Sequence, residues 1–485
     1  MRIKHLTMNI LSKIVAAKKQ EVVQLYQLHD LAALRARSPE PENNTPHFYH
    51  RLAASKEVGR PFFITEFKRK SPSEGWINQY ADLPAQVQAY ARAGAGAVSV
   101  LTDTDFFGGN YLDLQLAAET LGPLGENRPL LLQKDFIIDP IQIYLAKLHG
   151  ADIILLIAAI LEAEALQFLK NTAESLGMGV LVEVHDQEEL DKITHLDFPV
   201  LGVNNRDLKT FRTALNRVNV LRKNGGKRFI ISESGVRDVV DFQMVKRADG
   251  FLIGTGLMRR SDELQHQNTS EEQTFADFFQ TGGKLLFKAC GIRTTEMLAA
   301  SAPDFIGINF SPVSKRRPDA VFLEKLQEMP AIPPHWVAVF YKNTASEILE
   351  ILEKYPFQTV QLYAGDTTPD FVRTLKKRVL LAVSIRNASD LESVTAFAAD
   401  VDCFILDGAA PGSGQVIETA IPADFPYPFL LAGGLHAANL DRVLQFPNCI
   451  GVDVASGIEE GGAVSLGAIQ AISARLVELS SATVV

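Results

Sequence analysis

The chain has 485 residues, of which 47% are hydrophobic and 22% charged. This composition is that of an ordinary globular protein. The length accommodates either about three small domains or two α/β barrels of roughly 200–250 residues each. Forty-eight Lys and Arg against 57 Asp and Glu give a net charge of −9. An acidic chain without long blocks of like charge disfavours non-specific binding to nucleic acid or to an anionic membrane.

No membrane span or secretory signal is evident. The longest uninterrupted apolar run, 153–161, is much shorter than the roughly 20 residues that a bilayer requires. Residues 1–14 mix basic and apolar side chains and lack a signal-peptide cleavage site, so we expect a cytosolic protein. The three cysteines, Cys290, Cys403 and Cys449, are too widely spaced for a zinc site. We read Cys403 and Cys449 as apolar core residues, and we expect no metal and no cofactor.

Short apolar runs that end in polar residues form a first series of predicted strands. Helix-like stretches such as 83–93 and 186–193 lie between them. Near-continuous apolar strands alternating with amphipathic helices indicate parallel pairing, because strands buried on both faces need not alternate in polarity. Eight such units can close into a barrel. The predicted strands are 62–68, 97–102, 130–134, 153–157, 179–184, 200–204, 229–233 and 250–253.

A second series of eight strands follows a polar stretch at 261–273, a helix-like segment at 274–279 and Gly282-Gly283. We therefore predict an α/β protein of two consecutive (β/α)8 TIM barrels, with domains 1–282 and 283–485. A doubly wound open sheet is the competing architecture, because periodicity alone does not distinguish it from a barrel. The second series is 285–290, 305–310, 336–341, 359–363, 379–384, 403–407, 429–432 and 450–454.

The first barrel is preceded by an amphipathic helical pattern that runs from Leu11 to Leu25 and includes Lys18. This N-terminal helical extension could close the bottom of the barrel or form a lid over its active face, and the pattern leaves both readings open.

Polar residues of the first half fall at the ends of its strands. Reacting groups of an α/β barrel belong there, because the strand C-termini and the following loops form the active face. The solvent-exposed rim of a barrel would also be rich in charged residues. However, such a rim would not place Lys68, Lys134 and Glu183 at the ends of apolar strands. Two Gly-containing turns, Ser234-Gly235 and Gly254-Thr255-Gly256, follow strands seven and eight, where barrels often bind phosphate.

At these residues the first half, 1–280, resembles indole-3-glycerol phosphate synthase. The resemblance is carried by several motifs in order: the block 66–73, Lys134-Asp135-Phe136, Val182-Glu183-Val184-His185, 204–208 and 232–235. It implies that an anthranilate-linked phosphorylated deoxyribulose loses carbon dioxide and water while an indole ring closes.

By this resemblance, Lys134 is the general acid, which we expect to need a pKa lowered by burial and neighbouring cations. Glu183 serves as acid/base with Lys68 and Glu66, although a structural ion pair is the alternative for Glu66. We read His185 as a structural histidine rather than a base. The implied substrate contacts are Asn204, Arg206, Glu233 and Ser234, with Ser71, Gly235, Gly254 and Thr255 at the phosphate.

The second half has comparable strand ends. Cys290 ends its first strand, Asp407 ends its sixth, and Gly412-Ser413-Gly414 follows. Two further glycine loops occupy the phosphate positions and contain Gly433, Gly434, Ser456 and Gly457.

These residues resemble phosphoribosylanthranilate isomerase over 284–485, which implies an Amadori rearrangement of an N-glycosylated anthranilate. By resemblance Asp407 is the acid and Cys290 the base, and Arg316 binds the anthranilate carboxylate. The aspartic acid requires a raised pKa and the cysteine a lowered one. The chain departs from the family at Tyr363, where histidine is usual, at Arg317, where an aromatic is common, and at 459–464, which lacks the usual Gly-x-Lys-Asp.

Together the two resemblances imply a fused enzyme of tryptophan biosynthesis that acts on phosphorylated anthranilate derivatives. We expect a monomer, with other enzymes of the pathway as candidate partners. Two alternatives remain open at this stage. One is a Schiff-base lyase that uses Lys68 or Lys134, and the other is a second barrel that has lost its chemistry and only stabilises the first.

Overall fold

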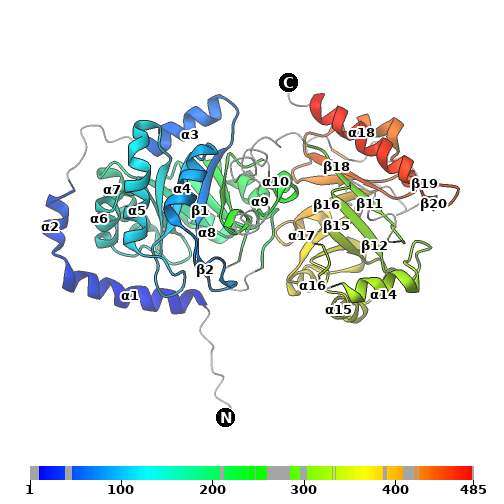
Figure 1. Cartoon of the computed structure of the whole chain (residues 1–485), viewed down its shortest axis with the longest axis horizontal. Coiled ribbons are helices and arrows are strands. Elements are labelled where there is room, and N and C mark those ends of the chain that lie inside the picture. Colours follow the sequence, from blue (N-terminus) through cyan, green and yellow to red (C-terminus); the bar gives the residue numbers. More distant parts are fainter. Residues whose placement is uncertain are drawn as a thin grey trace, which may run out of the picture. The chain divides into compact units, whose positions relative to one another are not determined.

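Two closed eight-stranded parallel barrels follow one another along the chain (Figure 1). The structure is a computed structural model, which describes residues 10–38, 46–207, 212–245, 247–258, 284–294, 303–329, 331–333, 335–385, 390, 392–407, 421–422 and 425–482. The predicted domain boundary, the helix-like segment 274–279 and Gly412-Ser413-Gly414 lie outside the described residues. The chain divides into two compact units, Met1–Phe211 with Leu221–Asp238 and Arg247–Gln280, and Arg212–Val220 with Val239–Lys246 and Thr281–Val485.

The first barrel consists of eight strands joined in sequence order, and β1 closes it by pairing with β10. Its strands are β1 (Phe62–Phe67), β4 (Ala97–Leu101), β5 (Leu130–Lys134), β6 (Ile153–Ile157), β7 (Gly179–Val184), β8 (Val200–Asn204), β9 (Phe229–Glu233) and β10 (Gly250–Ile253). The helices between them are α4 (Leu83–Arg92), α5 (Tyr111–Leu121), α6 (Pro140–Leu148), α7 (Ala163–Ser175), α8 (Gln187–Ile193), α9 (Arg217–Asn224) and α10 (Val239–Val245).

The second barrel closes in the same way, through the pairing of β11 with β18. Its strands are β11 (Leu286–Cys290), β12 (Phe305–Asn309), β13 (Trp336–Val339), β14 (Thr359–Tyr363), β15 (Arg378–Ser384), β16 (Cys403–Asp407), β17 (Phe429–Leu431) and β18 (Cys449–Val454). Its described α-helices are α14 (Ala320–Glu328), α15 (Ala345–Lys354), α16 (Pro369–Thr374), α17 (Glu392–Phe397) and α18 (Leu466–Ala482), and its described 3-10 helices are η2 (Ala364–Asp366), η4 (Ala437–Gln445) and η5 (Ser456–Ile458).

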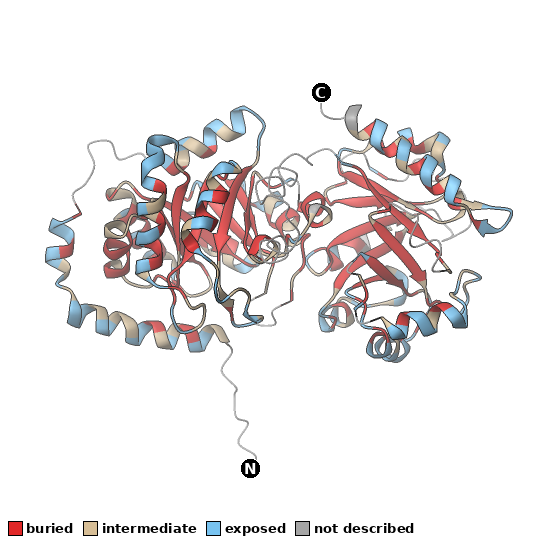
Figure 2. Cartoon of the chain, viewed as in Figure 1, coloured by how far each residue is buried: buried red, intermediate tan, exposed pale blue. Residues whose placement is uncertain are grey.

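Every predicted strand is present, with its ends within two residues of the prediction, and the closed sheets exclude the open doubly wound alternative. The strands are buried along almost their whole length (Figure 2), as expected for a parallel sheet covered on both faces. Cys403 and Cys449 are buried within β16 and β18. Among the described residues, none of the helices has the length and apolar character needed to cross a membrane.

Three N-terminal helices precede the first barrel: α1 (Ile10–Leu28), α2 (Leu31–Ala36) and α3 (His47–Glu57). Lys18 of α1 lies 3.3 Å from Asp103 and 2.7 Å from Asp135, which follow the C-terminal ends of β4 and β5. Helix α3 lies at the opposite end, where Phe48 contacts Phe62 at the start of β1. The amphipathic pattern read from the sequence therefore belongs to a helix at the active face, and a separate helix closes the bottom.

Candidate active sites

A buried lysine joins two carboxylates at the C-terminal end of the first barrel. Lys134 is the last residue of β5, and its Nζ lies 2.9 Å from Oε2 of Glu183 on β7 and 3.2 Å from Oε2 of Glu233 at the end of β9. Lys68, directly after β1, lies 2.7 Å from Oε1 of Glu66. The structure thus brings Lys134 and Glu183 together as predicted, and it pairs Glu66 with Lys68 as the structural alternative anticipated.

The expectation of a lowered pKa at Lys134 is wrong. Burial alone would lower the pKa, but the attraction of Glu183, Glu233 and Glu66 outweighs it, and the pKa is raised above its usual value. The neighbours of this lysine are carboxylates rather than cations, and they come from three strands that are far apart in the sequence. Lys134 is therefore protonated at neutral pH.

The two carboxylates beside Lys134 respond in opposite directions. Burial would raise the pKa of Glu183, but Lys134 and His185 hold it below its usual value. Burial raises the pKa of Glu233 to about 8, and the negative charges of Glu183 and Glu66 contribute to this rise while Lys134 opposes it. The site thus holds one ionised carboxylate and one neutral carboxylic acid near neutral pH.

His185 and Asn204 hold Glu183 from the side away from Lys134. Nε2 of His185 lies 3.1 Å from Oε1 of Glu183, and Nδ1 lies 3.0 Å from Oε2 of Glu189. Nδ2 of Asn204 donates a hydrogen bond of 3.1 Å to the same Glu183 oxygen. Although burial would lower its pKa, Glu183 and Glu189 raise the pKa of His185 to about 10. An imidazolium cannot act as a base, which agrees with the structural role predicted for this histidine.

Two glycines make room for the carboxylates. A Cβ added at Gly202 would lie 1.9 Å from Oε1 of Glu233, and one added at Gly254 would lie 2.5 Å from Oε1 of Glu66. The sequence predicted Gly254 only as a phosphate contact and gave no role to Gly202. Their packing function was missed because it depends on partners from other strands.

The remaining predicted phosphate and substrate contacts lie in the segments that follow β1, β8, β9 and β10. Ser234 and Gly235 follow β9 with φ of 61° and 92°, so the loop adopts the left-handed conformation that turns backbone N–H groups sharply. Gly254 accepts hydrogen bonds from the amides of Leu257 and Met258 in the helical turn that includes Thr255. Ser71 belongs to the short hairpin of β2 (Lys70–Ser71) and β3 (Gly75–Trp76), and Nη1 of Arg206 donates a hydrogen bond to Oγ of Ser73 between these two strands.

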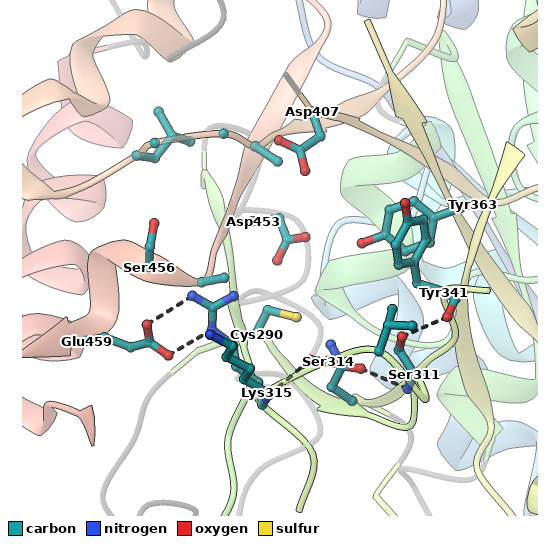
Figure 3. A pocket seen from close by; sticks show the side chains of 18 of the residues that line it. Cys290, Ser311, Ser314, Lys315, Tyr341, Tyr363, Asp407, Asp453, Ser456 and Glu459 are labelled. Atoms are coloured by element: carbon teal, nitrogen blue, oxygen red, sulfur yellow. Dashed lines mark hydrogen bonds and ion pairs between the residues drawn. The ribbon is translucent and has the colours of Figure 1, made fainter. Parts of the chain in front are cut away.

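The second barrel contains a cavity of about 690 Å³, within the range of roughly 300–1,000 Å³ typical of ligand sites. Cys290 and Asp407, the predicted base and acid, both line it (Figure 3). Asp453 of β18 also faces this cavity and forms an ion pair of 2.8 Å with the fully buried Lys288. Lys288 is paired in register with Asp453 and lies two residues before Cys290, on the same face of β11.

The expectation of a lowered pKa at Cys290 is also wrong. Burial raises the pKa of the thiol, and although Lys288 opposes this rise, Asp453 adds to it. The predicted raised pKa of Asp407, which is half-buried at the end of β16, stays a prediction.

Arg316 already has a carboxylate partner within the chain. Its Nε and Nη2 donate hydrogen bonds of 2.8 and 2.9 Å to the two oxygens of Glu459, which begins strand β19 (Glu459–Glu460) (Figure 3). Nη2 of Arg293 lies 3.4 Å from Oε1 of the same carboxylate. All three side chains line the cavity. The sequence marked Glu459 only as part of a segment that departs from the family pattern.

The glycine loop after β17 lies where it was predicted. Gly433 and Gly434 have φ of 88° and 62° and line the cavity together with Ser456. Gly457 packs closely against Leu435, since a Cβ added there would lie 1.9 Å from the Leu435 carbonyl oxygen, and its phosphate contact stays a prediction. Tyr363, one of the departures from the family, packs against Tyr341 in the cavity, with 4.7 Å between the ring centroids and an angle of 56° between the ring planes.

Comparison with known proteins links both sites to one pathway. The family model described as indole-3-glycerol phosphate synthase matches residues 11–269, and that of N-(5'-phosphoribosyl)anthranilate isomerase matches residues 287–474. Tryptophan biosynthesis protein TrpCF of Salmonella typhi is 34% identical over 463 residues, which cover 93% of this chain and 95% of that protein. The chain belongs to the bifunctional TrpCF family.

Each half of this TrpCF family member also has separate relatives. Indole-3-glycerol phosphate synthase of Bacillus mycoides is 43% identical over 256 residues, covering 52% of this chain and 94% of that protein. The crystal structure of phosphoribosylanthranilate isomerase from Thermus thermophilus has 28% sequence identity, covering 40% of this chain and 100% of that chain at a TM-score of 0.35. The chain is thus a bifunctional enzyme of tryptophan biosynthesis, with a decarboxylating lyase and an isomerase activity.

Proposed function

We propose that Lys134 is the general acid of the synthase barrel. In this reaction the aromatic carbon that bears the carboxylate attacks the ketone carbon of the deoxyribulose, and Lys134 gives its proton to the ketone oxygen as the new carbon–carbon bond forms. The carboxylate then leaves as carbon dioxide. The observation that carries this role is the contact of Lys134 with Glu183, because this ionised carboxylate keeps the lysine in the protonated form that an acid requires.

Glu183 is the proposed base for the dehydration that follows. Loss of the hydroxyl as water requires a proton on the departing oxygen and removal of the amine proton. Glu183, a carboxylate whose lowered pKa keeps it ionised, accepts the amine proton, and Lys68 gives a proton to the departing oxygen. Asn204 and His185 orient this carboxylate. Lys68 binds the substrate carboxylate and is itself oriented by Glu66. Ser71, Ser234, Gly235, Gly254 and Thr255 are the proposed phosphate contacts, and Arg206 and Asn204 position the anthranilate ring.

In the isomerase barrel we assign Asp407 as acid and Cys290 as base. Asp407 protonates the ring oxygen of the phosphoribosyl group, so that the ring opens and leaves a carbon–nitrogen double bond at C1. Cys290 then removes the proton from C2, and the resulting enolamine rearranges to the ketone with no net oxidation. Lys288 is placed to favour the thiolate. Gly433, Gly434 and Ser456 are the proposed phosphate contacts, and Arg316 contacts the carboxylate.

We further propose 1–282 and 283–485 as the two domains of an enzyme that works as a monomer in the cytosol. The product of the second barrel is then the substrate of the first.

Four substitutions test these roles. Lys134→Ala and Glu183→Gln should each lower the rate of indole-ring formation by about 10²–10⁴, the usual contribution of general acid–base catalysis. Cys290→Ala and Asp407→Asn should lower isomerase turnover to a similar extent. Near-normal rates in any variant would remove that residue from the mechanism.

Borohydride treatment in the presence of the phosphorylated ketose should leave synthase activity intact, because no Schiff base forms.

A further inference from the structure

Two arginines share one carboxylate at the wall of the isomerase cavity. Arg293 follows β11, Arg316 follows β12, and Glu459 belongs to a hairpin formed by β19 and β20 (Ala463–Val464). Glu459 accepts two hydrogen bonds from Arg316, at 2.8 and 2.9 Å, and forms a 3.4 Å ion pair with Arg293. The hairpin therefore presents its carboxylate to both guanidinium groups at once.

The charges of this group do not balance. Two guanidinium groups and one carboxylate leave a net charge of +1 facing the cavity, because arginine stays protonated in proteins. Glu459 occupies Nε and Nη2 of Arg316, which leaves Nη1 outside the pair. Nε of Arg293 is buried and has no hydrogen-bond partner within the part of the chain that the structure describes. A second carboxylate could thus bind without displacing the first.

This group lies close to the proposed base. A Cβ added at Gly291, the residue after Cys290, would lie 2.7 Å from Cδ of Arg316, so the Arg316 side chain packs against the backbone next to the thiol. In the substrate the carboxylate is ortho to the nitrogen that carries the sugar, only a few bonds from the C2 proton that Cys290 removes. A carboxylate anchored by these arginines would therefore hold that proton near the thiol.

We propose that Arg293 is a second carboxylate-binding residue of the isomerase site, and that Glu459 is the positioning residue that holds Arg293 and Arg316 together to receive the anthranilate carboxylate. This inference rests on the proposed isomerase function and names the residues that recognise the carboxylate of its substrate. The pair of arginines selects an aromatic amine that carries an ortho carboxylate over one that lacks it.

The test compares two substrates in the full-length protein, N-(5-phosphoribosyl)anthranilate and N-(5-phosphoribosyl)aniline, which lacks the carboxylate. Arg293→Gln should lower kcat/KM for the anthranilate substrate by about tenfold or more, chiefly through KM, as expected for loss of a charged hydrogen bond. The aniline substrate should be affected less than twofold. Glu459→Gln should reduce the preference for the carboxylate in the same direction, and Arg293→Lys should retain part of it.

Matched controls lie beside Glu459 and Arg316. Glu460→Gln on the same hairpin and Arg317→Gln next to Arg316 change exposed side chains and should leave the substrate preference unchanged. An unchanged preference in Arg293→Gln, or an equal loss with both substrates in both Arg293 variants, would overturn the proposal. A higher kcat/KM for the anthranilate substrate in Glu459→Gln would also contradict it, because Glu459 would then be a competitor. If the wild-type chain rearranged neither substrate, the proposed isomerase function would itself be wrong.

Discussion

Glu183 and Glu233 contact the same lysine, yet their surroundings separate their chemistry. Glu183 has Lys134 on one side and His185 and Asn204 on the other, so its charge is compensated from both sides. Glu233 has Lys134 alone, and its Oε1 is buried without a hydrogen-bond partner among the described residues. Two carboxyl groups with pKa values driven apart can serve as proton acceptor and proton donor in one site.

We predict that Glu233 carries a proton at neutral pH. Its pKa is raised to about 8, so the carboxyl is neutral below that pH and ionised above it. Infrared spectroscopy should detect a protonated carboxyl band that disappears as the pH rises through about 8 and that is absent from Glu233→Gln. In Glu183→Gln the band should titrate at a lower pH, because the charge of Glu183 helps to hold the proton. A band that Glu233→Gln leaves unchanged would assign the proton elsewhere.

A second prediction concerns the glycine beside Glu233. Gly202→Ala would place Cβ 1.9 Å from Oε1 of Glu233 and force the carboxyl away from Lys134. Synthase activity should fall by at least tenfold, and the protein should lose about 1–3 kcal/mol of stability, as is usual for overpacked cores. Isomerase activity measured on the same sample should be unchanged.

Gly122→Ala is the control, because a Cβ there would meet nothing within 4 Å. Synthase activity retained in Gly202→Ala would show that the position of Glu233 does not matter for catalysis.

At the level of single residues, the sequence predicted at which strand ends the candidate reactive groups lie, but it did not predict the direction of their pKa shifts. Lys134, Glu183, Cys290 and Asp407 could be found because strand ends define the active face of a barrel. The direction of each pKa shift depends on groups that arrive from distant strands, as the carboxylates around Lys134 do. Lys288 carried a detectable signal, since a lysine in an apolar strand two residues before Cys290 must share its face. Arg293 and Glu459 carried none, because their pairing spans 166 residues of chain.

Among the secondary-structure elements, helix α1 was likewise predicted only in part from the sequence. Its amphipathic spacing predicted a helix with one apolar face, but a pattern of this kind does not reveal the partner of that face. The contacts that fix the position of α1 are polar rather than apolar. Lys18 is buried and forms ion pairs with Asp103, Asp135 and Glu21. Asp135 directly follows Lys134, so these ion pairs hold the helix next to the proposed general acid.

Lys18→Met should release this helix. The substitution leaves Asp103 and Asp135 buried without their cation, a loss that typically costs about 3–5 kcal/mol. We expect faster cleavage within α1 in limited proteolysis and reduced synthase activity, with the isomerase unaffected.

Lys19→Met changes the adjacent, exposed lysine and should behave as the wild type. Equal protease resistance in the Lys18 and Lys19 variants would show that the ion pairs do not hold the helix.

For the molecule as a whole, the sixteen predicted strands favoured two barrels over three smaller domains, because each closed sheet requires eight strands. The net charge of −9 disfavours polyanions, but the substrates of both barrels are small anions. Local cations such as Lys68 and Arg316, together with glycine loops, must therefore attract them against the overall charge of the protein. The alternative of a second barrel without chemistry is disfavoured, since Cys290, Asp407 and Asp453 line one cavity.

We propose that each barrel carries one complete active site. The most direct test assays Lys134→Ala and Cys290→Ala chains, each with phosphoribosylanthranilate and with the ketose that the isomerase forms from it. We predict that the Lys134 variant forms the ketose but does not convert it, while the Cys290 variant leaves phosphoribosylanthranilate unchanged and still converts the ketose to indole-3-glycerol phosphate. Loss of both reactions through either substitution, or of neither, would contradict this division of the chemistry.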